Sequence, residues 1–183
     1  HHALYGNHLI TEMLALLKLS LLREEAPQSN RWKRYALQIL EEEYQKQFYP
    51  EGAHTELSAH YQRVVAINYQ KLLTLLRLSE QTELSDLWKP RVDQMWGYFA
   101  AIQKPSGFAP LNNDSDRENV RSLLKQYGHA DKTPPSTTRY FPNAGQVVFR
   151  NTTSKQSPLW AFFDIGPRGT DHQHEDFQHL SLS

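Results

Sequence analysis

The chain has 183 residues, of which 39% are hydrophobic and 11% aromatic, enough apolar surface for a folded core. Its 20 basic and 20 acidic side chains cancel, so the net charge gives no argument for binding nucleic acid or an anionic membrane surface. The absence of cysteine excludes disulfides, thiolate nucleophiles and cysteine-based zinc sites. No run of about 18 apolar residues occurs, so the sequence predicts no membrane span.

Helical periodicity dominates the first two thirds of the chain. The pattern predicts one helix up to a break at Pro27, a second after Ser29, a third after Thr55 and a fourth from about Thr82. A shorter helix is expected at 120–127. The inward face of the fourth helix is predicted to comprise Leu87, Trp88, Val92, Met95, Trp96 and Phe99.

The periodicity becomes strand-like in the last third. Strands are predicted at 146–150, 159–164 and 177–182. Helices first and strands later favour an α+β protein of more than one domain over alternating βαβ units. We therefore expect a helical domain at 1–130, a linker at 131–140 and the first strands of a truncated β-domain at 141–183. Because the chain starts directly before a helical pattern and stops in a strand-like one, we expect a fragment of a longer protein.

The most informative motif is His172-x-His174-x-Asp176, which follows a turn rich in Gly and Pro. Alternate residues of a strand point to the same face, and imidazole with carboxylate is typical of metal sites and of acid–base sites. Three interpretations stay open: a zinc triad, a catalytic His172 followed by a metal-binding His174, or a hydrogen-bonded surface strand.

The same spacing is similar to that of the metallo-β-lactamase-type hydrolases. In those enzymes another histidine normally follows the aspartate, whereas Phe177 stands there in this chain. The helical first domain does not suit that sandwich fold either. A metal-dependent hydrolase is therefore the second hypothesis.

Three further polar motifs have a structural as well as a functional interpretation. Asn7-His8 and 56–61 lie at predicted helix starts, where Asn, Ser and Thr commonly cap the helix. The oxygen-rich segment 112–116 lacks the spacing and the distal glutamate of an EF-hand, so a structured turn is favoured over a calcium site.

Taken in order, these motifs resemble the heparinase II/III family of polysaccharide lyases, which also includes alginate lyases. The resemblance covers nearly the whole chain. It rests on Asn7-His8-Leu9-Ile10, Trp32, 39–43, Glu56-x-Ser58-x-x-Tyr61, Pro110-x-Asn112-x-Asp114-Ser115-Asp116, 141–145, Asp164-x-Gly166-Pro167 and His172-x-His174-x-Asp176. One position departs from the pattern, because the family often has His directly after the tyrosine and this chain has Gln62, with His60 just before.

The resemblance implies an incomplete (α/α) helical toroid followed by the start of an antiparallel β-sandwich. It implies β-elimination on an anionic polysaccharide that contains 1,4-linked uronic acids, with Tyr61 and His172 sharing the proton transfers. Asn7, with help from His8, suits neutralisation of the substrate carboxylate, because an amide donates without titrating. Tyr61 is expected to be the acid, and also the base in a syn elimination, with His172 either as base for the opposite C5 configuration or as a partner of Tyr61.

The resemblance further implies a structural zinc ion with His174 as its first ligand. Asp176 is the local second candidate, and the remaining ligands are expected beyond Ser183. Relatives of this kind act in the bacterial periplasm or outside the cell. A non-catalytic glycan-binding protein on the same scaffold is an alternative, since fold does not determine activity. Candidate contacts for substrate carboxylates or sulfates are Arg63, Arg139, Arg150 and Arg168.

Overall fold

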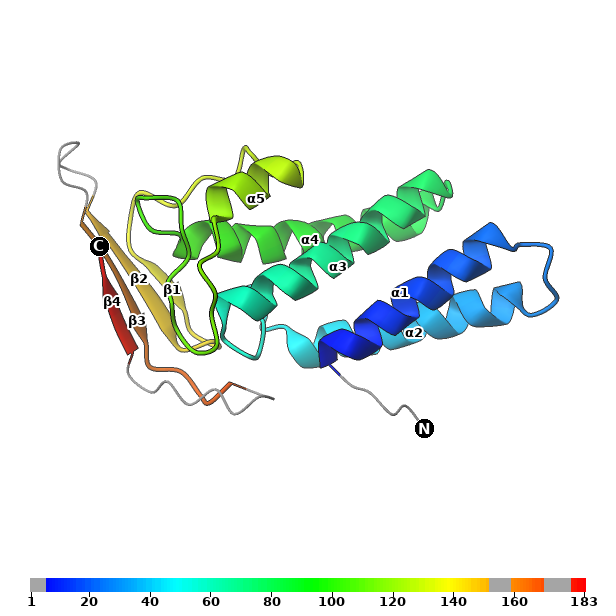
Figure 1. Ribbon diagram of the computed structural model, residues 1–183, viewed down its shortest axis with the longest axis horizontal. Helices are drawn as coiled ribbons and strands as arrows, with labels where there is room; N and C mark the ends of the chain where they lie inside the picture. The colour runs from blue at the N-terminus through cyan, green and yellow to red at the C-terminus, as the bar shows by residue number, and fades with distance from the viewer. Residues whose placement is uncertain (1–5, 152–158, 170–178) are drawn as a thin grey trace. The chain divides into compact units, whose positions relative to one another are not determined.

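The computed structural model describes residues 6–151, 159–169 and 179–183 (Figure 1). Within these residues five α-helices come first and four β-strands follow. Their bounds are α1 Gly6–Leu22, α2 Ser29–Gln47, α3 Ala59–Leu78, α4 Thr82–Ile102, α5 Val120–Gln126, β1 Arg139–Phe141, β2 Gln146–Asn151, β3 Leu159–Asp164 and β4 His179–Leu182. None of the helices in this part of the chain is long and apolar enough to cross a membrane.

The predicted elements are confirmed with small shifts at their ends. Of the strand predicted at 177–182, the structure describes His179–Leu182 as β4, and 177 and 178 lie outside the described residues. Strand β1 was not predicted. The prediction that Leu87 faces inward was wrong, because this residue is 53% exposed. The neighbouring Trp88 is 2% exposed, and adjacent residues of a helix do not share a face.

The chain forms two compact units, His1–Gln47 with Val64–Val92 and Phe48–Arg63 with Asp93–Ser183. The core of the first unit contains the stacked rings of Tyr69 and Trp88, with centroids 5.2 Å apart. The Tyr69 hydroxyl donates to the carbonyl of Leu40 at 2.8 Å. The Arg91 guanidinium lies 4.7 Å from the Trp88 ring centroid and pairs with Glu41. Buried aromatic pairs with satisfied polar ends hold such a helical core together.

The second unit has its helical core at Trp96, which is fully buried. The Trp96 ring stacks on Tyr127 and His129 at centroid distances of 5.3 and 5.2 Å. These contacts attach the chain directly after α5 to the C-terminal half of α4.

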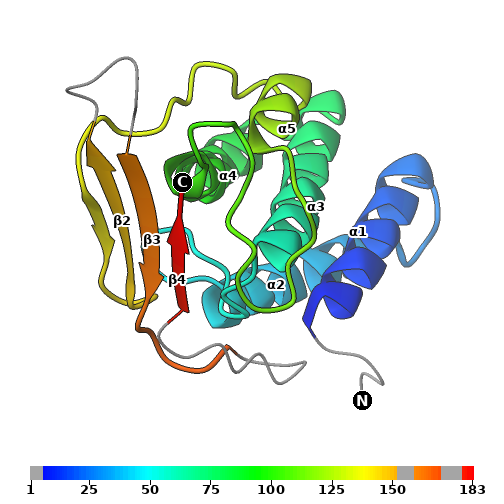
Figure 2. The same cartoon turned by 60° about the vertical axis from the view of Figure 1, so that its left-hand side comes forward.

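The four strands of the second unit form one antiparallel sheet in the order β1-β2-β3-β4 (Figure 2). Along β3 the buried side chains are Trp160, Phe162 and Asp164, the period-2 pattern of a sheet with one covered face. Asp164 therefore occupies a core position although it carries a carboxyl group. Helices followed by antiparallel strands confirm the expected α+β class.

Candidate active site

Tyr61 lies in the first turn of α3. Its backbone N–H donates to the hydroxyl of Ser58 at 3.5 Å, so the hydroxyl cap expected at this helix start is present and Ser58 supplies it. The Tyr61 ring meets the His60 ring edge to face, with centroids 5.2 Å apart. Partial burial, followed by the charges of Glu56 and Asp114, raises the pKa of the Tyr61 phenol above its ordinary value. The phenol is thus held in its protonated form at neutral pH.

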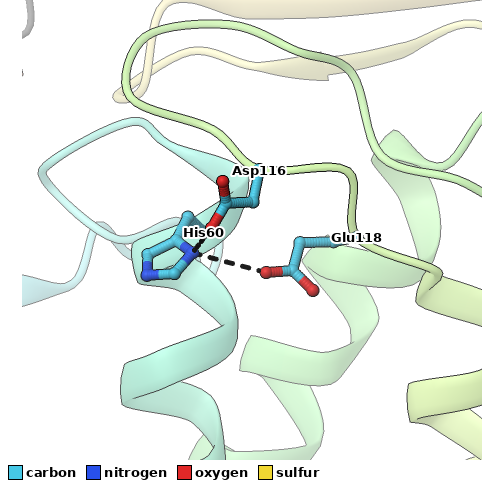
Figure 3. A group of neighbouring side chains, drawn as sticks. All are labelled: His60, Asp116 and Glu118. Atoms are coloured by element: carbon cyan, nitrogen blue, oxygen red, sulfur yellow. Dashed lines mark ion pairs between the residues drawn. The ribbon is translucent and has the colours of Figure 1, made fainter.

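Beside Tyr61, His60 faces two carboxylates from the chain that precedes α5 (Figure 3). Its Nδ1 lies 2.9 Å from Asp116 and 3.4 Å from Glu118. The guanidinium of Arg63, one helical turn further, lies 2.6 Å from the same oxygen of Glu118. With a protonated imidazole, the four side chains carry two positive and two negative charges and balance.

The potential ligand atoms of His60, Asp116 and Glu118 lie within 4.8 Å of one another, and imidazole with carboxylates is a zinc-type donor set. A dication would share the Glu118 oxygen with the guanidinium of Arg63, which already neutralises it. The residues therefore fit an ion-pair network better than a metal centre. Sequence reasoning did not identify Glu118, because its partners His60 and Arg63 are more than fifty residues away along the chain.

The segment 112–116 forms a structured turn, as predicted. Asn113 adopts φ of +51°, and the hydroxyl of Ser115 donates to the carbonyl of Asn112 at 2.5 Å. The same hydroxyl accepts from the backbone N–H of Ala59 at 2.9 Å, and Ser58 donates to the carbonyl of Asp114 at 2.8 Å. The turn therefore supports the first residues of the helix that carries Tyr61.

Asn7 and His8 lie in the first turn of α1, Asn7 half-buried and His8 exposed. They belong to the other compact unit, so their convergence with Tyr61 stays a prediction. His172, His174 and Asp176, the predicted base and the predicted zinc ligands, lie outside the described residues.

The predicted substrate-binding arginines differ in their surroundings. Arg139 on β1 and Arg168 after β3 are exposed, whereas Arg63 is engaged with Glu118. Arg150 donates to the backbone carbonyls of Ala101, at 2.9 Å, and of Gln103. Burial lowers the pKa of Arg150 to about 10. These contacts give Arg150 a structural role between β2 and the end of α4.

Comparison with known proteins identifies the family to which the chain belongs. The family model described as "Heparinase II/III N-terminus" matches residues 1–143. The chain is 25% identical over 163 residues to a heparin-sulfate lyase of Bacteroides stercoris, covering 88% of this chain and 23% of that protein. It is 27% identical over 179 residues to a heparin-sulfate lyase of Bacteroides thetaiotaomicron, covering 80% of this chain and 25% of that protein.

Solved structures agree. A heparinase III structure superposes with a TM-score of 0.82 at 21% identity, covering 97% of this chain and 30% of the other. The heparan sulfate lyase of Pedobacter heparinus gives a TM-score of 0.77 at 22% identity, covering 100% and 32%. These likenesses show the fold, an incomplete helical toroid followed by the first strands of an antiparallel β-sandwich.

The family model matches more than half of the chain and therefore identifies its family. The chain belongs to the heparinase II/III family. It spans about a quarter of the length of the curated relatives that it matches.

Proposed function

We propose that the whole protein carrying this chain is a lyase that cleaves uronic-acid-containing anionic glycans by β-elimination. Membership in the heparinase II/III family supports the reaction class, and the curated relatives are named heparin-sulfate lyases, so heparan-type polymers are the first substrates to test. The observation that carries the proposal is the family match over residues 1–143, and Tyr61, at a helix start capped by Ser58, is the candidate acid.

The reaction requires three tasks. The C5 proton lies next to a carboxylate and is barely acidic while that carboxylate keeps its full charge, so the enzyme must neutralise it, remove the proton and protonate O4 as it leaves. We assign the first task to Asn7, assisted by His8. The amide donates hydrogen bonds and keeps its charge state at every pH.

We assign protonation of O4 to Tyr61. A general acid must hold its proton until the transition state, and the raised pKa of the Tyr61 phenol supports that role. Its use as a base in a syn elimination would require a bound group that lowers this pKa. His172 is the proposed base for the opposite C5 configuration.

The remaining predicted residues complete the proposal. Arg63, Arg139 and Arg168 are proposed contacts for substrate carboxylates or sulfates, with Arg63 sharing its guanidinium with Glu118. His174 and Asp176 are proposed ligands of a structural zinc ion, which would fix the segment that carries His172. On the family resemblance, we extend the proposal to a periplasmic or secreted location, and to a helical domain at 1–130 and a β-domain from 141.

The test uses the whole protein with heparan sulfate, hyaluronan, chondroitin and alginate in parallel. Elimination leaves a C4–C5 double bond conjugated to the carboxylate, which absorbs ultraviolet light, whereas hydrolysis leaves none. An absorbance rise on one polymer supports the proposal and identifies the substrate class. New reducing ends without absorbance would indicate the metal-dependent hydrolase, and binding without either product would indicate a glycan-binding protein.

A further inference from the structure

A buried polar network connects four separate segments of the second unit. Asp164, the last residue of β3, accepts from the side-chain amide of Gln146 at 2.8 Å and from the backbone N–H of Gly166 at 3.1 Å. The side-chain amide of Asn112 lies 3.4 Å from the same carboxylate. The Tyr98 hydroxyl donates to the side-chain oxygen of Gln146. Tyr98, Asn112, Gln146 and Asp164 are each at most 5% exposed.

Burying the carboxylate of Asp164 at this position costs free energy of folding. Within the described residues, all of its hydrogen-bond donors are neutral amide groups, and burial raises the pKa of Asp164 despite them. The charge of His179, opposite Asp164 on β4, lowers that pKa in part, but a buried carboxylate without a hydrogen-bonded cation still costs free energy relative to a neutral residue. Its presence points to a role other than stability.

The other end of the network holds the backbone in front of α3. The Asn112 amide donates to the carbonyl of Leu57 at 2.7 Å, and the Asn113 amide donates to the same carbonyl at 2.9 Å. Leu57 has φ of +54°, a left-handed conformation that is strained for a leucine and persists only when its surroundings enforce it. Tyr61 follows in the first turn of the helix.

The side chain of Asn112 forms its hydrogen bonds through its amide nitrogen. Its amide nitrogen contacts both Leu57 and Asp164, while its side-chain oxygen is buried and has no hydrogen-bond partner in the described part of the chain. Buried unsatisfied acceptors cost free energy. The donor side of Asn112 is therefore the part of the residue that the fold uses.

We propose that Asn112 and Asp164 are positioning residues for the elimination reaction. They connect the strained turn before Tyr61 with the turn after β3, from which the chain runs on to His172. The loop between α4 and α5, which carries Asn112, passes both the start of α3 and the sheet (Figure 1). This inference rests on the proposed function, and neither residue is assigned a proton-transfer step.

The test compares Asp164→Asn, which keeps the size of the side chain, with wild type in the whole protein. Reactive groups displaced by about 1 Å lose up to about 100-fold in rate. At an assay temperature well below the melting temperature of the variant, we expect kcat to fall about 10- to 100-fold and KM to stay unchanged. A merely structural role would lower the melting temperature and leave kcat of the folded enzyme intact.

Gln103→Leu is the matched control, because Gln103 is also buried in this unit and its side chain donates to the carbonyl of Ala100, three residues away. Should Asp164→Asn not fold, Asn112→Ser decides, since it leaves the Asn113–Leu57 and Gln146–Asp164 bonds in place. Wild-type kcat in the folded variant, or a loss equal to that of the control, overturns the inference.

The two proposals can fail separately. If Tyr61→Phe is inactive while the Asp164 and Asn112 variants keep wild-type kcat, the lyase assignment stands and the positioning role is wrong. If wild type forms no unsaturated product from any polymer, both are wrong.

Discussion

The side-chain oxygen of Gln62 accepts a hydrogen bond from the backbone N–H of His54 at 2.7 Å. The amide nitrogen of Gln62 donates to the carbonyls of Gly52 and Met95 at 3.0 and 3.1 Å, and the residue is 1% exposed. The position after Tyr61, where the family often has histidine, is therefore occupied here by a structural residue whose polar atoms all bond to backbone.

Replacing Gln62 with histidine should destabilise the protein by about 1–3 kcal/mol, because two ring nitrogens cannot satisfy three buried backbone groups. The measurement is urea unfolding of the variant. Gln45→His, on the exposed face of α2, is the control and should stay within about 0.5 kcal/mol of wild type. Equal stability of Gln62→His would contradict the structural role.

Gly145 forms the turn between β1 and β2 with φ of +64°. A Cβ atom there would lie 2.1 Å from the Cα of Gly166, so Gly145→Ala should lower the melting temperature and release the turn after β3. Gly97→Ala in α4 has free space around its new methyl group and should stabilise by about 0.5–1 kcal/mol. Thermal unfolding of the Gly145→Ala and Gly97→Ala variants measures both effects. Similar shifts of the melting temperature in the two variants would contradict the prediction.

The group of His60, Asp116 and Glu118 and the predicted ligands His174 and Asp176 are expected to differ in zinc binding. Because Arg63 already neutralises Glu118, His60→Ala should leave bound zinc unchanged, whereas His174→Ala should reduce it. Elemental analysis of the purified whole proteins after dialysis measures both. Loss of zinc in His60→Ala would show that the ion-pair interpretation is wrong.

The pH dependence of kcat reports on Tyr61. Because its pKa is raised above the ordinary tyrosine value of about 10, the acid is present at neutral and mildly alkaline pH and is lost only as pH rises through the raised pKa. We expect no alkaline fall in kcat from Tyr61 below about pH 10. An alkaline fall well below that value, absent from the residual activity of Tyr61→Phe, would contradict a raised pKa, and a rise of kcat with pH that Tyr61→Phe loses would indicate a base instead of an acid.

Periodicity was sufficient for the five helices and for three of the strands, because local spacing reflects which face is buried. It failed for Leu87, which lies one residue from the inward Trp88, and for the three-residue strand β1. The third helix was predicted after Thr55, and the structure begins it at Ala59, after the Ser58 cap. The contacts of Asn112 with Leu57 and of Glu118 with Arg63 join residues about 55 positions apart, and no local pattern encodes such pairs.

The rate of unsaturated-product formation by Tyr61→Phe, measured on the polymer that wild type cleaves, tests the proposed role of Tyr61 most directly. Removal of a general acid should lower kcat by about 100- to 10,000-fold, while Tyr140→Phe, a change at an exposed ring on β1, should keep wild-type kcat. A folded Tyr61→Phe enzyme with wild-type kcat would contradict the assignment of Tyr61 as the acid and the elimination mechanism proposed for this family member.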